Sequence, residues 1–440
     1  MRIGIIGVLF SIVFGGMIMA DDFPPVRKAV ECTPRSGLPN FFAKAAAGGE
    51  YKVAYLGGSI TAQTGYRVKS LAYLNQRYPN CKFSEINAAI GGTGSDLGVL
   101  RIDHDVFLGK PDLLLVEFAV NDGGQQPEEI VRAMEGMVRK TWKQFPECDI
   151  MFVYTFTESL LKELKTGNFN RSAATMEVVA DHYGIPTIHM GLEAVRLESE
   201  GTLLIKAPEA KMERVSGDDL NRASKAVVGP DGKIAFSNDG VHPYIDTGHQ
   251  LYEEAIERSM PAIIAASGKA APHTLVPPYN PKNYDRSVML PIAAGTQTGP
   301  WTKLPPDEGQ GKSFANRVDS LWKAEPGATL SFSFKGSAVK MYDLLGPDCG
   351  KIEVTLDGKV FAANRIDPYC TYWRLALLGV GNDLDDTAVH NVTVKVLPDK
   401  LDKAKILFPQ NLPDLEENPA KYEGANWYAG AIFIIGDLVK

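Results

Sequence analysis

One short loop of the sequence places an acid and a base three residues apart. It reads SNDGVHP over residues 237–243. This spacing lets the Asp239 carboxylate reach one ring nitrogen of His242, which leaves the other ring nitrogen free to take a proton. A serine hydroxyl needs such a base, because it is a weak nucleophile on its own. The loop therefore predicts nucleophilic catalysis by a serine that lies elsewhere in the sequence.

Three glycine-rich polar loops offer this serine and the groups that would stabilise its reaction. Each loop follows an apolar run: GGSIT at 57–61, GGTGS at 91–95 and NDGG at 121–124. Ser59 is the candidate nucleophile. The candidate oxyanion donors are the N–H groups of Ser59 and Gly92 and the side-chain amide of Asn121. Three such donors would stabilise the tetrahedral intermediate of acyl transfer, and losing one typically costs about 100- to 1000-fold in rate.

A parallel sheet would bring these loops together. Five apolar runs are interpreted as buried strands, at residues 53–56, 83–89, 113–119, 150–155 and 186–189. Segments with helical periodicity lie between them, the clearest running from Pro127 to Trp142. This alternation predicts an α/β fold, a three-layer α/β/α sandwich of flavodoxin-like topology with strand order 2-1-3-4-5. In that order the loops of Ser59, Gly92 and Asn121 meet at the carboxyl edge of the sheet.

The composition changes after Gly268. Prolines cluster between residues 272 and 281, which predicts a linker or docking strap over residues 269–282. Beyond it, strand alternation replaces helical periodicity, and Asp357–Gly358 has the signature of a tight hairpin turn. Residues 283–440 are therefore expected to form an all-β sandwich of the jelly-roll type, separate from an α/β domain at residues 21–268.

Residues 1–20 are expected to be a signal peptide. Arg2 precedes an apolar run from Ile3 to Met19, and Ala20 is followed by two aspartates. This predicts a secreted or periplasmic protein with no membrane span after cleavage, and an uncleaved membrane anchor is the alternative. The 440 residues are 45% apolar and 22% charged, which excludes a disordered chain. The net charge of −7 argues against a nucleic-acid partner.

The sequence resembles the SGNH hydrolases, also called GDSL esterases, over roughly residues 50–265. Four blocks match in order: GGSIT at 57–61, NAAIGG at 87–92, VND at 120–122 and DGVH at 239–242. The resemblance implies one role for each residue: nucleophile Ser59, oxyanion donors Gly92 and Asn121, and triad partners Asp239 and His242. Gly58 stands where the family name implies Asp, and Ala119 where glycine is usual, but neither departure removes a catalytic atom.

These observations together predict a secreted serine esterase that removes O-acetyl or other short acyl groups from a polysaccharide or oligosaccharide. The reaction would pass through an acyl-enzyme. The C-terminal sandwich resembles galactose-binding-like jelly rolls of carbohydrate-active enzymes, so the acetylated glycan substrate is inferred by analogy. Two alternatives stay open: a lipid esterase or lysophospholipase of the same fold, and a glycan-binding protein with a vestigial esterase fold. No cofactor or metal is implied, because no Cys/His cluster has zinc spacing.

Other residues allow a structural or a functional interpretation. His104 lies between Asp103 and Asp105, and we favour a solvated connector between strands over a metal site or a second acid–base pair. Glu117 lies within an apolar strand, so it is either a paired buried acid or a cleft residue. Asp122 is expected to orient the Asn121 loop, and His189 to be structural.

The sandwich carries two further open questions. Cys349 and Cys370 bracket the predicted hairpin and could form a disulfide. Four tryptophans belong to this region: Trp301, Trp322, Trp373 and Trp427. They either pack in the core of the sandwich or in its interface with the α/β domain, or they contact a glycan, and we favour packing.

Overall fold

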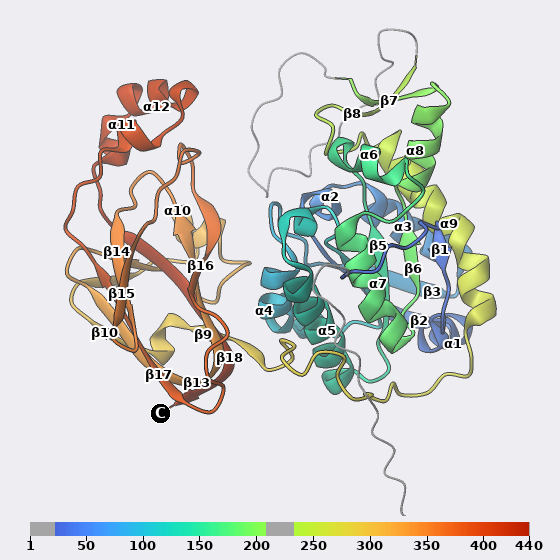
Figure 1. The fold of residues 1–440 in the computed structure, drawn as a ribbon, viewed down its shortest axis with the longest axis horizontal. Helices are drawn as coiled ribbons and strands as arrows, with labels where there is room; N and C mark the ends of the chain where they lie inside the picture. The colour runs from blue at the N-terminus through green and yellow to red at the C-terminus, as the bar shows by residue number, and fades with distance from the viewer. Residues whose placement is uncertain (1–22, 208–232, 440) are drawn as a thin grey trace, which may run out of the picture.

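The computed structural model describes residues 23–207 and 233–439. The expected signal peptide lies outside these residues. Within them the chain forms two parts that lie side by side, an α/β part followed by a β-sandwich (Figure 1). No helix in the described ranges is long and apolar enough to cross a membrane.

The α/β part is built on a six-stranded sheet of described residues. Its spatial order is β1 (Cys32–Thr33), β6 (Thr187–His189), β5 (Asp149–Tyr154), β4 (Leu113–Glu117), β2 (Gly49–Gly57) and β3 (Cys81–Asn87). Strands β2 to β6 are parallel, and every residue of β4 and β5 is buried, as in a parallel sheet covered on both faces. The expected order 2-1-3-4-5 is confirmed. The antiparallel edge strand β1 was not predicted, because two residues show no periodicity.

Helices cover both faces of this sheet, which confirms the three-layer expectation. One face packs against α4 (Ser95–Asp105), α5 (Pro127–Gln144) and α7 (Arg171–Tyr183). The other packs against α1 (Pro39–Ala47), α3 (Tyr66–Arg77) and α9 (Gly248–Ala266). Helix α5 begins at Pro127 as expected, and its apolar stripe from Ile130 to Trp142 is buried.

Shorter elements complete the α/β part. They are α2 (Ser59–Ala62), α6 (Leu161–Leu164), α8 (Leu192–Ser199) and two short parallel strands, β7 (Leu203–Lys206) and β8 (Ile234–Ser237). Single 3-10 turns occur at Phe107–Gly109, Asn121–Gly124 and Glu158–Leu160. Two of these elements position the site, since α2 begins at Ser59 and β8 leads into the His242 loop.

The second part is an antiparallel sheet that folds into a sandwich. Its strands are β9 (Ser287–Pro291), β10 (Thr296–Thr298), β11 (Trp301–Lys303), β12 (Trp322–Ala324), β13 (Thr329–Leu345), β14 (Lys351–Leu356), β15 (Lys359–Asn364), β16 (Arg374–Gly381), β17 (Val389–Val396) and β18 (Trp427–Val439). Short helices lie at its edges: α10 (Gly309–Ser313), α11 (Lys403–Ile406) and α12 (Leu412–Glu417). The expected all-β class is confirmed. Asp357 and Gly358 form the predicted hairpin turn, with φ of 49° and 81°.

The structure bears on the two questions that the sequence left open for the sandwich, the disulfide and the tryptophans. Cys349 and Cys370 are both buried free thiols, so the disulfide considered from their spacing is absent. Trp427 is fully buried, and the Trp301 ring lies 5.8 Å from it. The Trp373 ring packs 4.4 Å from Tyr428. Trp427 thus fills the core, as favoured from the sequence, whereas Trp301, Trp322 and Trp373 are only partly buried.

The segment between α9 and β9 packs against the α/β part and forms hydrogen bonds with it. The His273 ring stacks on Trp142 at 4.2 Å, and its Nε2 lies 2.7 Å from an Asp149 oxygen. The backbone N–H groups of Tyr279 and Asn280 donate to the Glu135 carboxylate. Apolar side chains of α4 and α5 then continue into those of β13 and β18 as one buried cluster. The two parts therefore share a packed interface.

Candidate active site

Three side chains predicted to act together converge at the carboxyl edge of the parallel sheet. Ser59 is the first residue of α2, directly after β2, and His242 follows β8. The His242 ring donates from Nδ1 to Asp239 Oδ2 at 2.7 Å. Its Nε2 lies 2.9 Å from Ser59 Oγ and is free to accept the hydroxyl proton. This is the geometry of a nucleophile, a general base and an orienting acid.

The hydrogen bonds around the Asp239 carboxylate favour its ionised form. Its Oδ1 accepts the backbone N–H groups of Val241 and His242 at 2.8 and 2.7 Å. Burial by itself raises the pKa of Asp239, but the hydrogen bonds from the His242 ring and backbone outweigh burial and lower this pKa to about 2. An ionised Asp239 fixes the His242 tautomer that leaves Nε2 without a proton.

The His242 loop has a defined shape. Gly240 has a φ of +85°, a conformation that favours glycine. Its N–H donates to Ser237 Oγ at 2.9 Å, and its carbonyl accepts the Glu158 N–H at 2.7 Å. Ser237 also forms an isolated bridge with Pro243. These contacts keep the acid and the base at a fixed distance from Ser59.

The three predicted oxyanion donors belong to loops that follow neighbouring parallel strands, β2, β3 and β4. The Ser59 N–H opens a helix and so has no partner within it. Gly92 is exposed with a φ of +73°, and Asn121 follows the neighbouring strand β4. Among the described residues neither the Gly92 N–H nor the Asn121 amide donates a hydrogen bond. These donors are therefore available to a bound ester oxygen.

The position of Asn121 explains why glycine stands at position 58, where the family usually has aspartate. A Cβ at position 58 would lie 2.0 Å from Asn121 Oδ1 and 2.8 Å from its Cγ. The missing side chain thus leaves room for the Asn121 amide beside Ser59. Asn121 and Gly58 are matched to each other in this chain.

Glu117 lies beneath the nucleophile, at the end of β4. It is fully buried, and its two oxygens accept the hydroxyls of Thr61 and Thr155 at 2.9 and 2.6 Å. Burial raises the pKa of Glu117, although these bonds and one from the Gly58 N–H oppose the rise. Glu117 is thus a paired buried acid, one of the two interpretations that the sequence left open. Its link to the Ser59 turn was not predicted, because Thr61 and Thr155 carry no motif.

Asp122 lies between two of the candidate oxyanion loops. Its Oδ1 accepts the Ser95 N–H at 3.0 Å, while its Oδ2 has no hydrogen-bond partner in the described part of the chain. Burial raises the pKa of Asp122 to about 7, assisted by the nearby charges of Asp96 and Glu117. The hydrogen bond between the Ser95 N–H and Asp122 connects the Asn121 loop to the start of α4.

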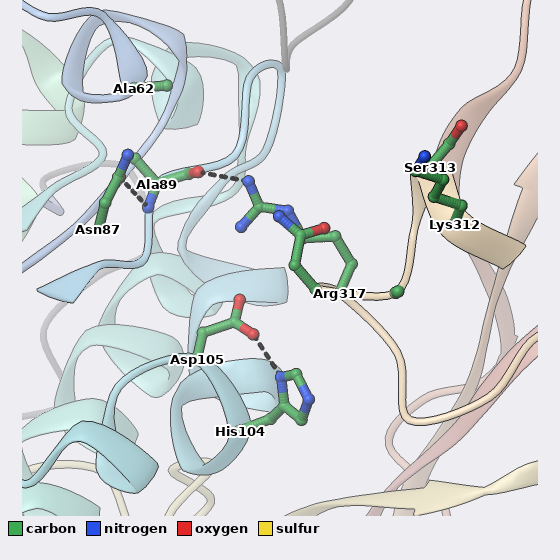
Figure 2. Close-up of a pocket in the computed structure, with 10 residues that line it drawn as sticks. Ala62, Asn87, Ala89, His104, Asp105, Lys312, Ser313 and Arg317 are labelled. Carbon is green, nitrogen blue, oxygen red and sulfur yellow. Dashed lines mark hydrogen bonds and ion pairs between the residues drawn. The ribbon is translucent and has the colours of Figure 1, made fainter. Parts of the chain in front are cut away.

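A polar cavity of about 620 Å³ lies between the α/β part and the sandwich, lined by Ala62 at the end of α2 and by Ala89 just before the Gly92 loop. Figure 2 shows Ala62, Asn87 and Ala89 on one side, and Lys312 and Ser313 on the other. Arg317, in the segment after α10, extends across and donates to the Ala89 carbonyl at 3.4 Å. Both parts of the chain thus form walls of one cavity.

His104 also lines this cavity, which corrects its interpretation as a solvated connector. It lies in the last turn of α4, half-buried, and its Nδ1 contacts Asp105 at 2.6 Å. The hydrogen bond to Asp105 raises the pKa of His104 against the effect of burial. His189 is fully buried and accepts the Gly191 N–H, in keeping with a structural role. Among the described residues, no group of three His, Cys, Asp or Glu side chains could hold a metal ion.

Residues 55–251 match the model of the GDSL-like Lipase/Acylhydrolase family. This range contains all five residues assigned to the site from the sequence. A comparison with curated protein sequences gave no match.

The whole chain is similar in fold to solved structures. A two-domain esterase (CEX) active on acetylated mannans, co-crystallized with mannopentaose, has a TM-score of 0.65 and 17% identity. The alignment covers 93% of this chain and 97% of that one. A second structure of a two-domain esterase of this name has a TM-score of 0.65 and 18% identity, over 92% and 97% of the two chains. At this identity the likeness is one of fold, and it extends over both parts.

Proposed function

We propose that this chain is a carboxylic ester hydrolase that removes O-acetyl groups from a polysaccharide or oligosaccharide, since residues 55–251 match the GDSL-like Lipase/Acylhydrolase family model. The hydrogen-bonded series Ser59–His242–Asp239 carries this proposal. Its atoms lie at the distances that proton transfer from a nucleophilic hydroxyl requires.

The mechanism follows from these atoms. Ser59 Oγ attacks the acetyl carbonyl carbon while His242 Nε2 takes the hydroxyl proton. The Asp239 carboxylate stabilises the imidazolium, and the donors of Ser59, Gly92 and Asn121 stabilise the tetrahedral oxyanion. The intermediate collapses, and His242 gives its proton to the departing sugar oxygen. Water, deprotonated by His242, then cleaves the acetyl-enzyme to acetate and free Ser59.

The polar cavity supports a glycan as the alcohol part of the ester. Asparagine, serine, lysine, arginine, histidine and aspartate side chains line it, and among the described residues its apolar lining side chains are the methyls of Ala62, Ala89 and Ala315. Such a surface suits sugar hydroxyls, whereas a long acyl chain needs an apolar channel. We therefore place the sugar units next to the acetyl group in this cavity, with α10 of the sandwich as one wall. A glycan substrate is also supported by the fold relative CEX, which is active on acetylated mannans.

Acetate release from a panel of acetylated polysaccharides tests the substrate class. We expect release from at least one acetylated glycan, and a preference for acetyl over octanoyl in a series of 4-nitrophenyl esters. A preference for octanoyl would favour the lipid esterase. Tight retention on polysaccharide without fluorophosphonate labelling of Ser59 would favour a glycan-binding protein with a vestigial fold.

Export of the chain belongs to the same proposal and rests on the N-terminal sequence. Intact mass of the protein recovered from its native host tests it. We expect a mass that corresponds to loss of residues 1–20, and retention of this segment would indicate a membrane anchor instead.

A further inference from the structure

Helix α4 connects the candidate oxyanion loop to the β-sandwich. Its first residue, Ser95, follows the Gly92 loop by three positions, and the helix lies on the face of the α/β part toward the sandwich (Figure 1). The sandwich contacts this helix at its beginning, middle and end. In that order the contacts are Lys340 Nζ to Asp96 Oδ2 at 3.5 Å, Ser287 Oγ to the Val99 carbonyl at 3.0 Å and Asp319 Oδ1 to His104 Nε2 at 3.4 Å.

Lys340 is the most unusual of these groups. It lies on β13, it is only 9% exposed, and Asp96 is its one ion-pair partner in the described ranges. A buried ammonium group loses much of its hydration, and attraction to a single carboxylate at 3.5 Å offsets little of that cost. The ion pair therefore contributes little to the stability of the fold. The position of Lys340 suggests a second effect, because Asp96 lies in the first turn of α4.

The beginning of α4 is tied to both candidate oxyanion loops. The Ser95 N–H donates to Asp122, which directly follows Asn121. On its other side Ser95 continues through Gly94 to Gly92. A shift of the first turn of α4 would therefore move the Gly92 N–H relative to the Asn121 amide. Arg317 adds a further contact at the Ala89 carbonyl, just before the same loop.

We propose that the β-sandwich sets the position of the oxyanion donors through α4, with Lys340 as the positioning residue. The inference rests on the proposed function. We therefore expect the sandwich to affect the rate of the chemical step, even for esters too small to contact the sandwich. A module that only binds glycan or only packs would leave that rate unchanged.

The experiment compares Lys340→Met with wild type in the full chain, using 4-nitrophenyl acetate as the small substrate. Methionine has nearly the length of lysine and suits a buried site. We expect kcat to fall about 10-fold with KM within twofold, because small displacements of oxyanion donors weaken transition-state stabilisation. Asp96→Asn removes the partner charge at a less buried position and should lower kcat in the same direction. The double variant should lose no more than Lys340→Met alone.

Asp383→Asn provides the matched control. Asp383 lies on the sandwich and pairs with Arg132 of α5 at 2.8 Å, so this variant loses an ion pair across the interface without touching α4. Its kcat should equal the wild-type value. If Lys340→Met and Asp96→Asn also retain wild-type kcat, the inference is wrong while the proposed function stands. If wild-type protein hydrolyses no acetyl ester, the proposed function and this inference fail together.

Discussion

Two buried aspartates, one in each part of the molecule, differ in how fully they are paired. In the sandwich, buried Asp343 is fully paired: Arg365 donates to both of its oxygens and Trp427 Nε1 adds a third bond at 2.8 Å. In the α/β part, buried Asp122 keeps one oxygen without a partner, and the Asn121 amide is likewise unused within the described chain. Satisfied polar groups stabilise a fold, whereas polar groups left available at one edge mark a site of chemistry.

Strand topology explains the difference. Parallel strands β2, β3 and β4 end at one edge, so the loops after them meet. The antiparallel strands of the sandwich send successive loops to opposite ends, and their burial alternates, as in β14. The comparison predicts that changes at the sheet edge affect turnover, whereas changes to the paired charge in the sandwich affect stability.

Among the changes to residues around the nucleophile, the largest effect is expected for Asp239→Asn. The variant keeps the shape of the side chain but favours the wrong His242 tautomer, so kcat for 4-nitrophenyl acetate should fall about 10⁴-fold. Exposed Asp246, four residues beyond His242, provides the control, and Asp246→Asn should retain wild-type kcat. Equal losses in the two variants would mean that the loop, and not the carboxylate, matters.

Arg365→Met should act on stability alone. It leaves the Asp343 carboxylate buried and unpaired, which costs about 3–5 kcal/mol in free energy of unfolding. Urea denaturation measures this loss, and kcat of the folded variant should match wild type. Arg286→Met, which breaks the more exposed pairs with Asp386 and Asp437, should cost below about 1 kcal/mol. A similar cost for both would remove the contrast drawn between the two parts.

Asn121→Ala tests one oxyanion donor. Removing the side-chain amide should lower kcat about 100- to 1000-fold with little change in KM, because the donor acts mainly in the transition state. Asn168→Ala is the control and should behave as wild type, because within the described residues this half-buried side chain donates only to the Thr166 hydroxyl. A raised KM with unchanged kcat would instead assign Asn121 to substrate binding.

Asp122→Asn should have the smallest effect, and that effect should depend on pH. The pKa of Asp122 is about 7 in the folded state against 3.8 as its ordinary value, so the folded state holds the proton more tightly. The stability this group contributes is present below pH 3.8 and is lost as pH rises through 7. The variant lacks this dependence. Between pH 5 and pH 8 it should therefore lose about 2 kcal/mol less unfolding free energy than wild type. An identical pH dependence in both proteins would contradict the raised pKa.

Sequence reasoning reached the sheet order and the residues of the candidate site because each follows from a local pattern. Apolar runs locate the strands, and topology then places the loops of Ser59, Gly92 and Asn121 together. The hydrogen bonds that support the site could not be predicted from the sequence, since Glu117 contacts Thr61 and Thr155 only in the folded protein, where strands β4 and β5 are paired. The same holds for α4, whose contact with Lys340 spans more than 240 residues of sequence. For His104, the acidic neighbours on both sides favoured a solvated connector over the helix that the structure contains.

Hydrolysis of 4-nitrophenyl acetate by wild type and by Ser59→Ala tests the central claim most directly. Ser199→Ala, which removes a hydroxyl that donates to the Val195 carbonyl within α8, is the matched control. If Ser59 is the nucleophile, Ser59→Ala should lose about 10⁴-fold or more in kcat, while Ser199→Ala keeps the wild-type value. Equal rates in wild type and Ser59→Ala would contradict the account.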